Sequence, residues 1–159
     1  MIELLKKMIM EEVVKGRALD RYATMASRET INAIKDETVI EAFNTNGRVD
    51  FALDVPEITD DIDYLRMIII KMREGDRVAT DGAYEFDLDA DEDERTTSDI
   101  YVNVTLPPRY DEDYSFMSRL VAELKETFRH ELEHSSQSTE ELMAVQRAVP
   151  DRQVWKDLE

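Results

Sequence analysis

The chain of 159 residues contains no cysteine, two histidines and a single tryptophan. The absence of cysteine excludes disulfide bonds, thiolate nucleophiles and cysteine-ligated zinc, which leaves imidazole and carboxylate groups to hold any metal. Basic residues are also scarce, with 20 lysines and arginines against 37 aspartates and glutamates and a formal net charge of -17. Because such a charge repels phosphate backbones, we expect no nucleic-acid partner.

Long apolar runs are missing as well. The longest, Met67–Ile70, is far shorter than a membrane span requires. The N-terminal stretch MIELLKKMIMEEVV carries lysines and glutamates among its apolar residues, so it lacks the uninterrupted apolar region of a signal peptide. We therefore expect a cytoplasmic protein with no membrane partner.

Length and a hydrophobic content of 42% predict a single domain over residues 1–159. Its N-terminal segment, 1–40, is predicted to be helical. Apolar residues recur at helical spacing over residues 2–15, with Gly16 as the expected stop. A second helical stretch is predicted over Ala18–Asp36, with Asp20 or Ser27 as its N-terminal cap.

Residues 48–108 are predicted to form a sheet. Three stretches alternate apolar and polar residues and a fourth is a run of isoleucines, which gives strands over 48–55, 65–72, 84–90 and 100–106. A helix beginning at Thr59 is the alternative for the second strand. The last strands are predicted to form a short antiparallel meander that leads into a helix over 115–135, followed by a helical segment over 138–159. The predicted fold class is α+β, with a small antiparallel or mixed sheet packed against the 115–135 helix and with N-terminal helices.

Both histidines lie on the 115–135 helix, in the sequence HELEH at 130–134. Taking Leu120 as zero at 100° per residue, Glu131 projects at about 20°, inside the apolar sector, whereas Glu133 projects at about 220°, toward solvent. His130 and His134 project at the margin of the sector. A carboxylate on the buried side of a helix is costly unless it is paired, hydrogen-bonded or near a metal, so Glu131 requires a partner.

A zinc site supplies that partner. Imidazoles four residues apart on adjacent helical turns converge on one ion, and the glutamate beside the first of them can hold and deprotonate the attacking water. The alternative is that His130 and His134 are two surface histidines on a helix rich in charge.

The sequence HELEH fits the HExxH signature of zincin metallopeptidases. The passage from YEFDLD through TSDIYVNVTLPP to RHELEHSSQ, within about residues 84–145, resembles the small zincin-like proteins encoded by tailed bacteriophages. The resemblance implies zinc as cofactor, His130 and His134 as ligands, Glu131 as the general base and a peptide or protein as substrate. It also implies an edge strand, either 84–90 or 100–106, that binds an extended peptide by strand addition. If the protein is phage-encoded, it would act in the host cytoplasm or in the virion.

A catalytic zinc commonly has a third protein ligand. Glu140 stands six residues after His134, the offset that metzincin-like sites use, although Gln137 stands where those sites have glycine. Glu141 is the gluzincin-like alternative, and Ser138–Glu141 also reads as a capping box that explains the glutamate without a metal. A ligand missing from this chain is the remaining alternative.

The sequence is also compatible with two functions other than a zinc-dependent peptidase. One is a catalytically inactive zincin-like protein that serves as a phage structural or interaction component. The other is an acidic module that binds basic partners through Asp87–Glu94, a stretch whose spacing partly matches a calcium loop but lacks its glycine and its final glutamate. The sequence leaves the oligomeric state open.

Overall fold

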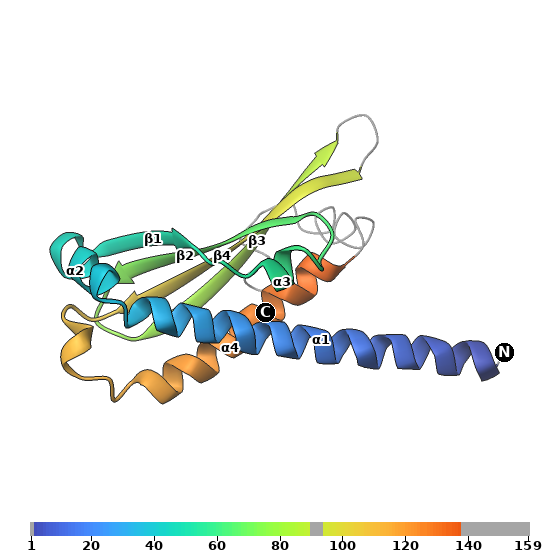
Figure 1. Cartoon of the computed structure of the whole chain (residues 1–159), viewed down its shortest axis with the longest axis horizontal. Coiled ribbons are helices and arrows are strands. Elements are labelled where there is room, and N and C mark those ends of the chain that lie inside the picture. The colour runs from blue at the N-terminus through green and yellow to red at the C-terminus, as the bar shows by residue number, and fades with distance from the viewer. Residues whose placement is uncertain (1, 90–93, 138–159) are drawn as a thin grey trace.

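Helices cover one face of a small mixed sheet in the computed structural model, which describes residues 2–89 and 94–137 (Figure 1). This arrangement confirms the predicted α+β class. Among the described residues, no helix combines the length and the apolar composition needed to cross a membrane. The elements in chain order are α1 (Ile2–Ile34), α2 (Glu37–Asn46), β1 (Arg48–Ala52), α3 (Pro56–Thr59), β2 (Leu65–Glu74), β3 (Ala79–Asp89), β4 (Glu94–Leu106), the 3-10 turn η1 (Tyr110–Glu112) and α4 (Met117–Ser136).

The N-terminal segment is one continuous helix, so the predicted stop at Gly16 and the predicted caps at Asp20 and Ser27 are wrong. A Cβ at Gly16 would meet no atom within 4 Å, so the position is tolerated in a helix without being needed for a turn. The hydroxyl of Ser27 donates to the carbonyl of Ala23 within the helix instead of capping a new one. Glycine costs a helix interior about 1 kcal/mol relative to alanine, which is too little to end a helix whose apolar residues keep helical spacing on both sides of Gly16.

Helix α2 was not predicted, although its ends carry clear signals. The Asp36 carboxylate accepts hydrogen bonds from the backbone N–H groups of Thr38 and Val39 at 2.9 and 3.4 Å. Gly47 closes the helix in the left-handed conformation at φ 71°, where its N–H donates to the Phe43 carbonyl. Phe43 is the buried side chain of α2, and it anchors the helix in the core.

The sheet has the strand order β1-β2-β4-β3. β1 and β3 run antiparallel to their neighbours, whereas β2 and β4 are parallel, with Ile68 opposite Ile100 and Ile70 opposite Val102. The predicted antiparallel meander is therefore wrong: β3 forms a hairpin with β4 but lies at the edge, and β4 inserts between β2 and β3. A mixed sheet was one of the two forms predicted.

The strands lie close to their predicted positions, but β2, β3 and β4 are longer than predicted and β1 is shorter. Predicted strands at 84–90 and 100–106 extend to Ala79–Asp89 and Glu94–Leu106, and the strand at 65–72 extends to Glu74. The first strand ends at Ala52. The alternative of a helix beginning at Thr59 is wrong, because the single turn of α3 ends at that residue and Leu65–Glu74 forms a strand. Pairing with a neighbouring strand extends β2, β3 and β4 over residues that do not alternate between apolar and polar types.

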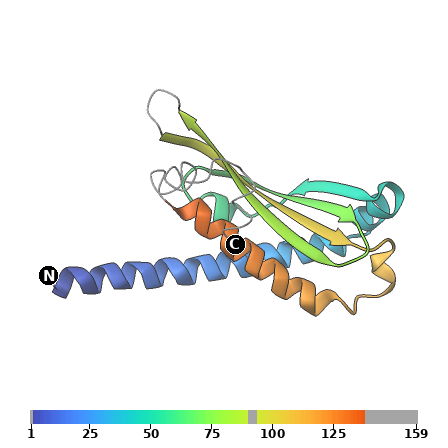
Figure 2. The ribbon, with the colours of Figure 1, turned by 180° about the vertical axis from the view of Figure 1, so that it is seen from behind.

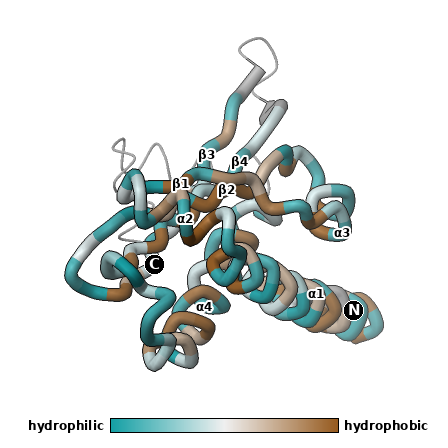
Figure 3. Tube along the Cα trace, turned by 60° about the vertical axis from the view of Figure 1, so that its left-hand side comes forward, coloured by the Kyte–Doolittle hydropathy of each residue, from teal (hydrophilic) through white to brown (hydrophobic). Residues whose placement is uncertain are grey.

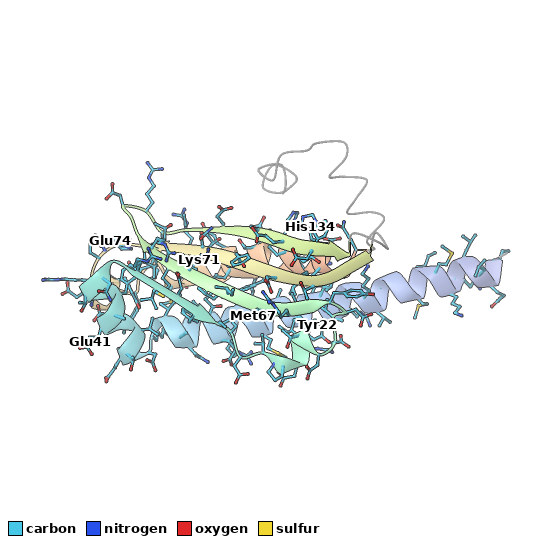
Figure 4. The ribbon with its side chains drawn as sticks, turned by 90° about the horizontal axis from the view of Figure 1, so that it is seen from above. Tyr22, Glu41, Met67, Lys71, Glu74 and His134 are labelled. Carbon is cyan, nitrogen blue, oxygen red and sulfur yellow. The ribbon has the colours of Figure 1, made fainter. Side chains whose placement is uncertain are left out.

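The core lies between the sheet and the helices α1 and α4. Alternate residues in the middle of β2 and β4 are fully buried there: Ile68, Ile70, Met72, Ile100, Val102, Val104 and Leu106. Aliphatic residues of both helices are buried with them, and Figure 3 shows the hydropathy of each position along the chain. Figure 2 shows α1 and α4 crossing beneath the sheet. The opposite face carries partly exposed residues such as Met67 and Lys71 (Figure 4), and the Lys71 ammonium lies 4.8 Å from the Tyr101 ring centre.

Candidate metal centre

Helix α4 buries one side along its whole length. Its apolar residues at successive turns have no exposed surface: Leu120, Leu124, Phe128 and Leu132. Glu131 lies on the same side and is also 0% exposed, whereas the side chain of Glu133 is 57% exposed. The predicted inward direction of Glu131 and outward direction of Glu133 are confirmed, because both follow from the helical period.

The inward-facing residues of β3 run alongside this part of α4. Thr80 lies against Thr127, with hydroxyl oxygens 2.9 Å apart. Tyr84, four residues further along β3, stacks on His134, with ring centres 6.5 Å apart and an interplanar angle of 21°. Alternate strand residues share a face, so Thr80, Gly82 and Tyr84 all face α4. Thr80 contributes a hydroxyl group, Gly82 has no side chain, and Tyr84 contributes an aromatic ring.

Gly82 provides the space for Glu131. A Cβ built at Gly82 would lie 2.8 Å from Cγ and 2.9 Å from Oε1 of Glu131, and 2.9 Å from Cγ2 of Thr127. Glycine inside a strand often marks a close approach of another group to the backbone. Here the absent side chain lets the glutamate of HELEH lie directly on the backbone of the edge strand.

The two histidines lie on adjacent turns of α4, with ring centres 4.9 Å apart and ring planes at 88°. Imidazoles that share a tetrahedral zinc ion at a Zn–N distance of about 2.1 Å have ring centres roughly 5 Å apart. The Nε2 atom of His130 is buried and forms no hydrogen bond within the described part of the chain. A buried ring nitrogen of this kind fits a metal ligand.

The orientation of His134 is set by Gln137. Its Nδ1 lies 3.2 Å from the amide oxygen Oε1 of Gln137, and because that oxygen only accepts, Nδ1 carries the proton. With Nδ1 protonated, Nε2 is the nitrogen of His134 that would bind a metal, and the residue as a whole is 8% exposed. Gln137 itself is extended, at φ -72° and ψ 152°, so its backbone does not form the left-handed turn that glycine would give there.

The proposed third ligand is not among the described residues. Glu140 and its alternative Glu141 both lie in 138–159, outside the described ranges. Within residues 2–89 and 94–137, no group of three histidine or carboxylate side chains is close enough to hold a metal ion. The structure therefore places His130, Glu131 and His134 on one side of α4, and Glu140 or Glu141 as the third ligand stays a prediction.

A cavity of about 350 Å³ lies beside His130, between the start of β3 and α4. His130 lies at its wall, together with Thr80, Thr127, Arg119, Glu123 and Glu126. The Arg119 guanidinium pairs with Glu123 at 3.0 Å, and Glu126 is exposed. Because β4 is paired on both sides, β3 is the edge strand next to this cavity, which decides between the two strands that the sequence left open.

The acidic stretch Asp87–Glu94 includes the last residues of β3 and the first residue of β4. Asp87 is exposed and accepts a hydrogen bond from the Thr97 hydroxyl at 3.3 Å. Residues 90–93 lie outside the described residues, so binding of basic partners by this stretch remains a prediction.

Sequence reasoning missed the contribution of β3. Gly82, Thr80 and Tyr84 line the site, but only Gly82 carried a signal, as the one glycine within an otherwise alternating strand. No protein-family model matches the chain, and comparison with curated proteins and with solved structures found no match either.

Proposed function

We propose that the protein is a zinc-dependent peptidase of the zincin type, with His130 and His134 as zinc ligands and Glu131 as the general base. The observation that carries this proposal is the position of Glu131. It is fully buried between two histidines on adjacent turns and lies against the backbone of an edge strand at Gly82. A purely decorative histidine pair on a charged helix does not require a buried glutamate between its members.

The residues of the chain divide the reaction between them. A bound zinc ion would polarise the scissile carbonyl and lower the pKa of a water molecule. Glu131 accepts the proton of the water that attacks the carbonyl carbon and transfers it to the amine nitrogen as the C–N bond breaks. The edge strand β3 would hold the peptide in an extended conformation by backbone hydrogen bonds, and Gln137 holds His134 in the ring orientation that ligation needs.

The first experiment measures metal content after expression in zinc-supplemented medium. We expect close to one zinc ion per chain in the parent protein, and loss of zinc in the His130→Ala, His134→Ala double variant. Glu140→Ala and Glu141→Ala, compared for zinc affinity, identify the third ligand. Metal-free parent protein would contradict the proposal.

The second experiment measures cleavage of a peptide library in the presence of zinc. Glu131→Gln should keep its zinc and lose cleavage. The matched control is Glu133→Gln, a change of the same kind in the same motif at an exposed position, and it should cleave like the parent. Zinc binding without cleavage by the parent would instead assign the protein to the inactive zincin-like class.

A further inference from the structure

One flank of α4 projects past the edge of the sheet. Four residues at successive turns project within about 60° of one another at 100° per residue: Arg119, Glu123, Glu126 and His130. The buried core residue Phe128 projects about 160° from His130, and Glu131, which faces β3, projects between these two. The flank therefore lies on the side of β3 that carries no described strand, and it forms one wall of the cavity beside His130.

A peptide that adds to β3 would lie over this flank. β3 and α4 run in the same direction, because Thr80 contacts Thr127 and Tyr84 stacks on His134. Neighbouring strands are about 4.8 Å apart, so an added strand lies beyond β3 on the side of the flank. Every second side chain of the added strand would point toward α4, as alternate residues of β3 do.

The spacing of the two elements sets which peptide side chain meets which residue of α4. Side chains on one face of a strand recur about every 6.7 Å, and residues four apart on a helix are about 6 Å apart along its axis. Glu126 lies about one turn before His130, so a peptide side chain at the height of Glu126 is about two residues from the bond held at His130. That side chain enters the cavity beside His130, between α4 and the start of β3.

The charges of the cavity wall favour a positive side chain at this position. The Arg119 guanidinium is already paired with the Glu123 carboxylate at 3.0 Å. Thr80 and Thr127 are neutral, and their hydroxyl oxygens lie 2.9 Å apart. Glu126 is exposed and pairs with no cation of the described residues, so its carboxylate is the uncompensated charge of the wall. A lysine or arginine side chain would neutralise this charge, whereas an acidic side chain would be repelled.

We propose that the cavity beside His130 is a specificity pocket for a lysine or arginine side chain of the peptide, with Glu126 as the specificity-determining residue. The proposal rests on the proposed function, which supplies the extended peptide. A peptide antiparallel to β3 places the basic residue after the cleaved bond, and a parallel peptide places it before that bond. General attraction of basic peptides to a chain with a net charge of -17 would select no position.

Peptide binding tests the pocket without cleavage. Zinc-loaded Glu131→Gln is titrated, by fluorescence anisotropy, with labelled ten-residue peptides of threonine, glutamine and alanine that differ only in a central lysine, methionine or glutamate. We expect the lysine peptide to bind about two- to fivefold more tightly than the methionine peptide, the range of an exposed ion pair, and the glutamate peptide to bind most weakly. Adding Glu126→Lys should reverse the order of the lysine and glutamate peptides. The matched control adds Glu41→Lys instead, the same charge change at an exposed residue of α2 (Figure 4), and should keep the original order.

Cleavage of a peptide library by the zinc-loaded parent, with the cut sites identified by mass spectrometry, separates the two proposals. We expect lysine or arginine to be enriched about two residues from the cut, on one side only. A parent that cleaves no peptide overturns the proposed function, and the affinities still decide the pocket. Cleavage without this enrichment, or the same order of affinities for the Glu126→Lys and Glu41→Lys variants, overturns the pocket and leaves the peptidase in place.

Discussion

Replacing Gly82 by alanine is the most direct test of the way α4 lies on the edge strand. The added Cβ would lie 2.8 Å from Glu131 Cγ and 2.9 Å from both Glu131 Oε1 and Thr127 Cγ2. Carbon atoms in good contact are about 3.5–4.0 Å apart, so α4 and β3 must separate by roughly 0.7 Å or more. The side chains cannot absorb this shift alone, because Glu131 is fully buried.

The expected cost is the difference between two effects. Inserting a methyl group into a tightly packed region costs about 1–3 kcal/mol. Replacing glycine by alanine also lowers the entropy of the unfolded chain, which stabilises the protein by about 0.4–1 kcal/mol. The net destabilisation of Gly82→Ala should therefore be about 1–2 kcal/mol, which lowers the midpoint of urea unfolding by roughly 0.5–1 M at an m value of about 2 kcal/mol/M.

Urea unfolding followed by circular dichroism measures this change, and Gly16→Ala is the control. A Cβ at Gly16 meets nothing within 4 Å in the middle of α1, so this variant should be more stable than the parent by about 0.5–1 kcal/mol. In a Glu131→Ala background, Gly82→Ala should cost less, because part of the clash is gone. An unchanged midpoint for Gly82→Ala, or the same cost in both backgrounds, would refute the close approach of Glu131 to β3.

Further stability changes follow from single contacts elsewhere in the fold. Asp36→Ala removes the N-cap of α2 and should lower the free energy of unfolding by about 1 kcal/mol in the same urea assay, whereas Asp36→Asn should retain most of it. Phe128→Ala empties a fully buried site and should cost about 3–5 kcal/mol. Tyr110→Phe removes the hydrogen bond from the phenol to the Ile34 carbonyl, at 2.6 Å, and should cost about 1 kcal/mol at neutral pH. Burial raises the pKa of Tyr110 above its value in the unfolded chain. The contribution of the neutral phenol to the free energy of unfolding is therefore complete below about pH 10 and is lost as the pH rises through the folded-state pKa. Above about pH 10, stability should decline less steeply in Tyr110→Phe than in the parent.

The features that the sequence predicted correctly are those set by local periodicity. The direction of Glu131 and Glu133 followed from the helical period, since Leu120, Leu124 and Phe128 define the buried side of α4. The strands followed from alternation in the same way. In each case neighbouring residues along the chain contain the information that decides the structure.

The features that the sequence did not predict depend on contacts between distant segments. The exchange of β3 and β4 in strand order leaves the alternation of both strands unchanged, so no local pattern distinguishes it from a meander. The contact of Gly82 with Glu131 likewise needs the relative position of a strand and a helix.

The pairing of the first described helix with the last has a consequence for synthesis on the ribosome. Arg129 of α4 binds Asp20 of α1 at 2.7 Å across 109 positions of the chain, and β2 must likewise wait for β4. At an elongation rate of about 5–20 residues per second, α1 exists for roughly 5–20 s before α4 emerges. During that interval the side of α1 that α4 later covers stays exposed on the nascent chain, so the core closes only after the last described helix has left the ribosome.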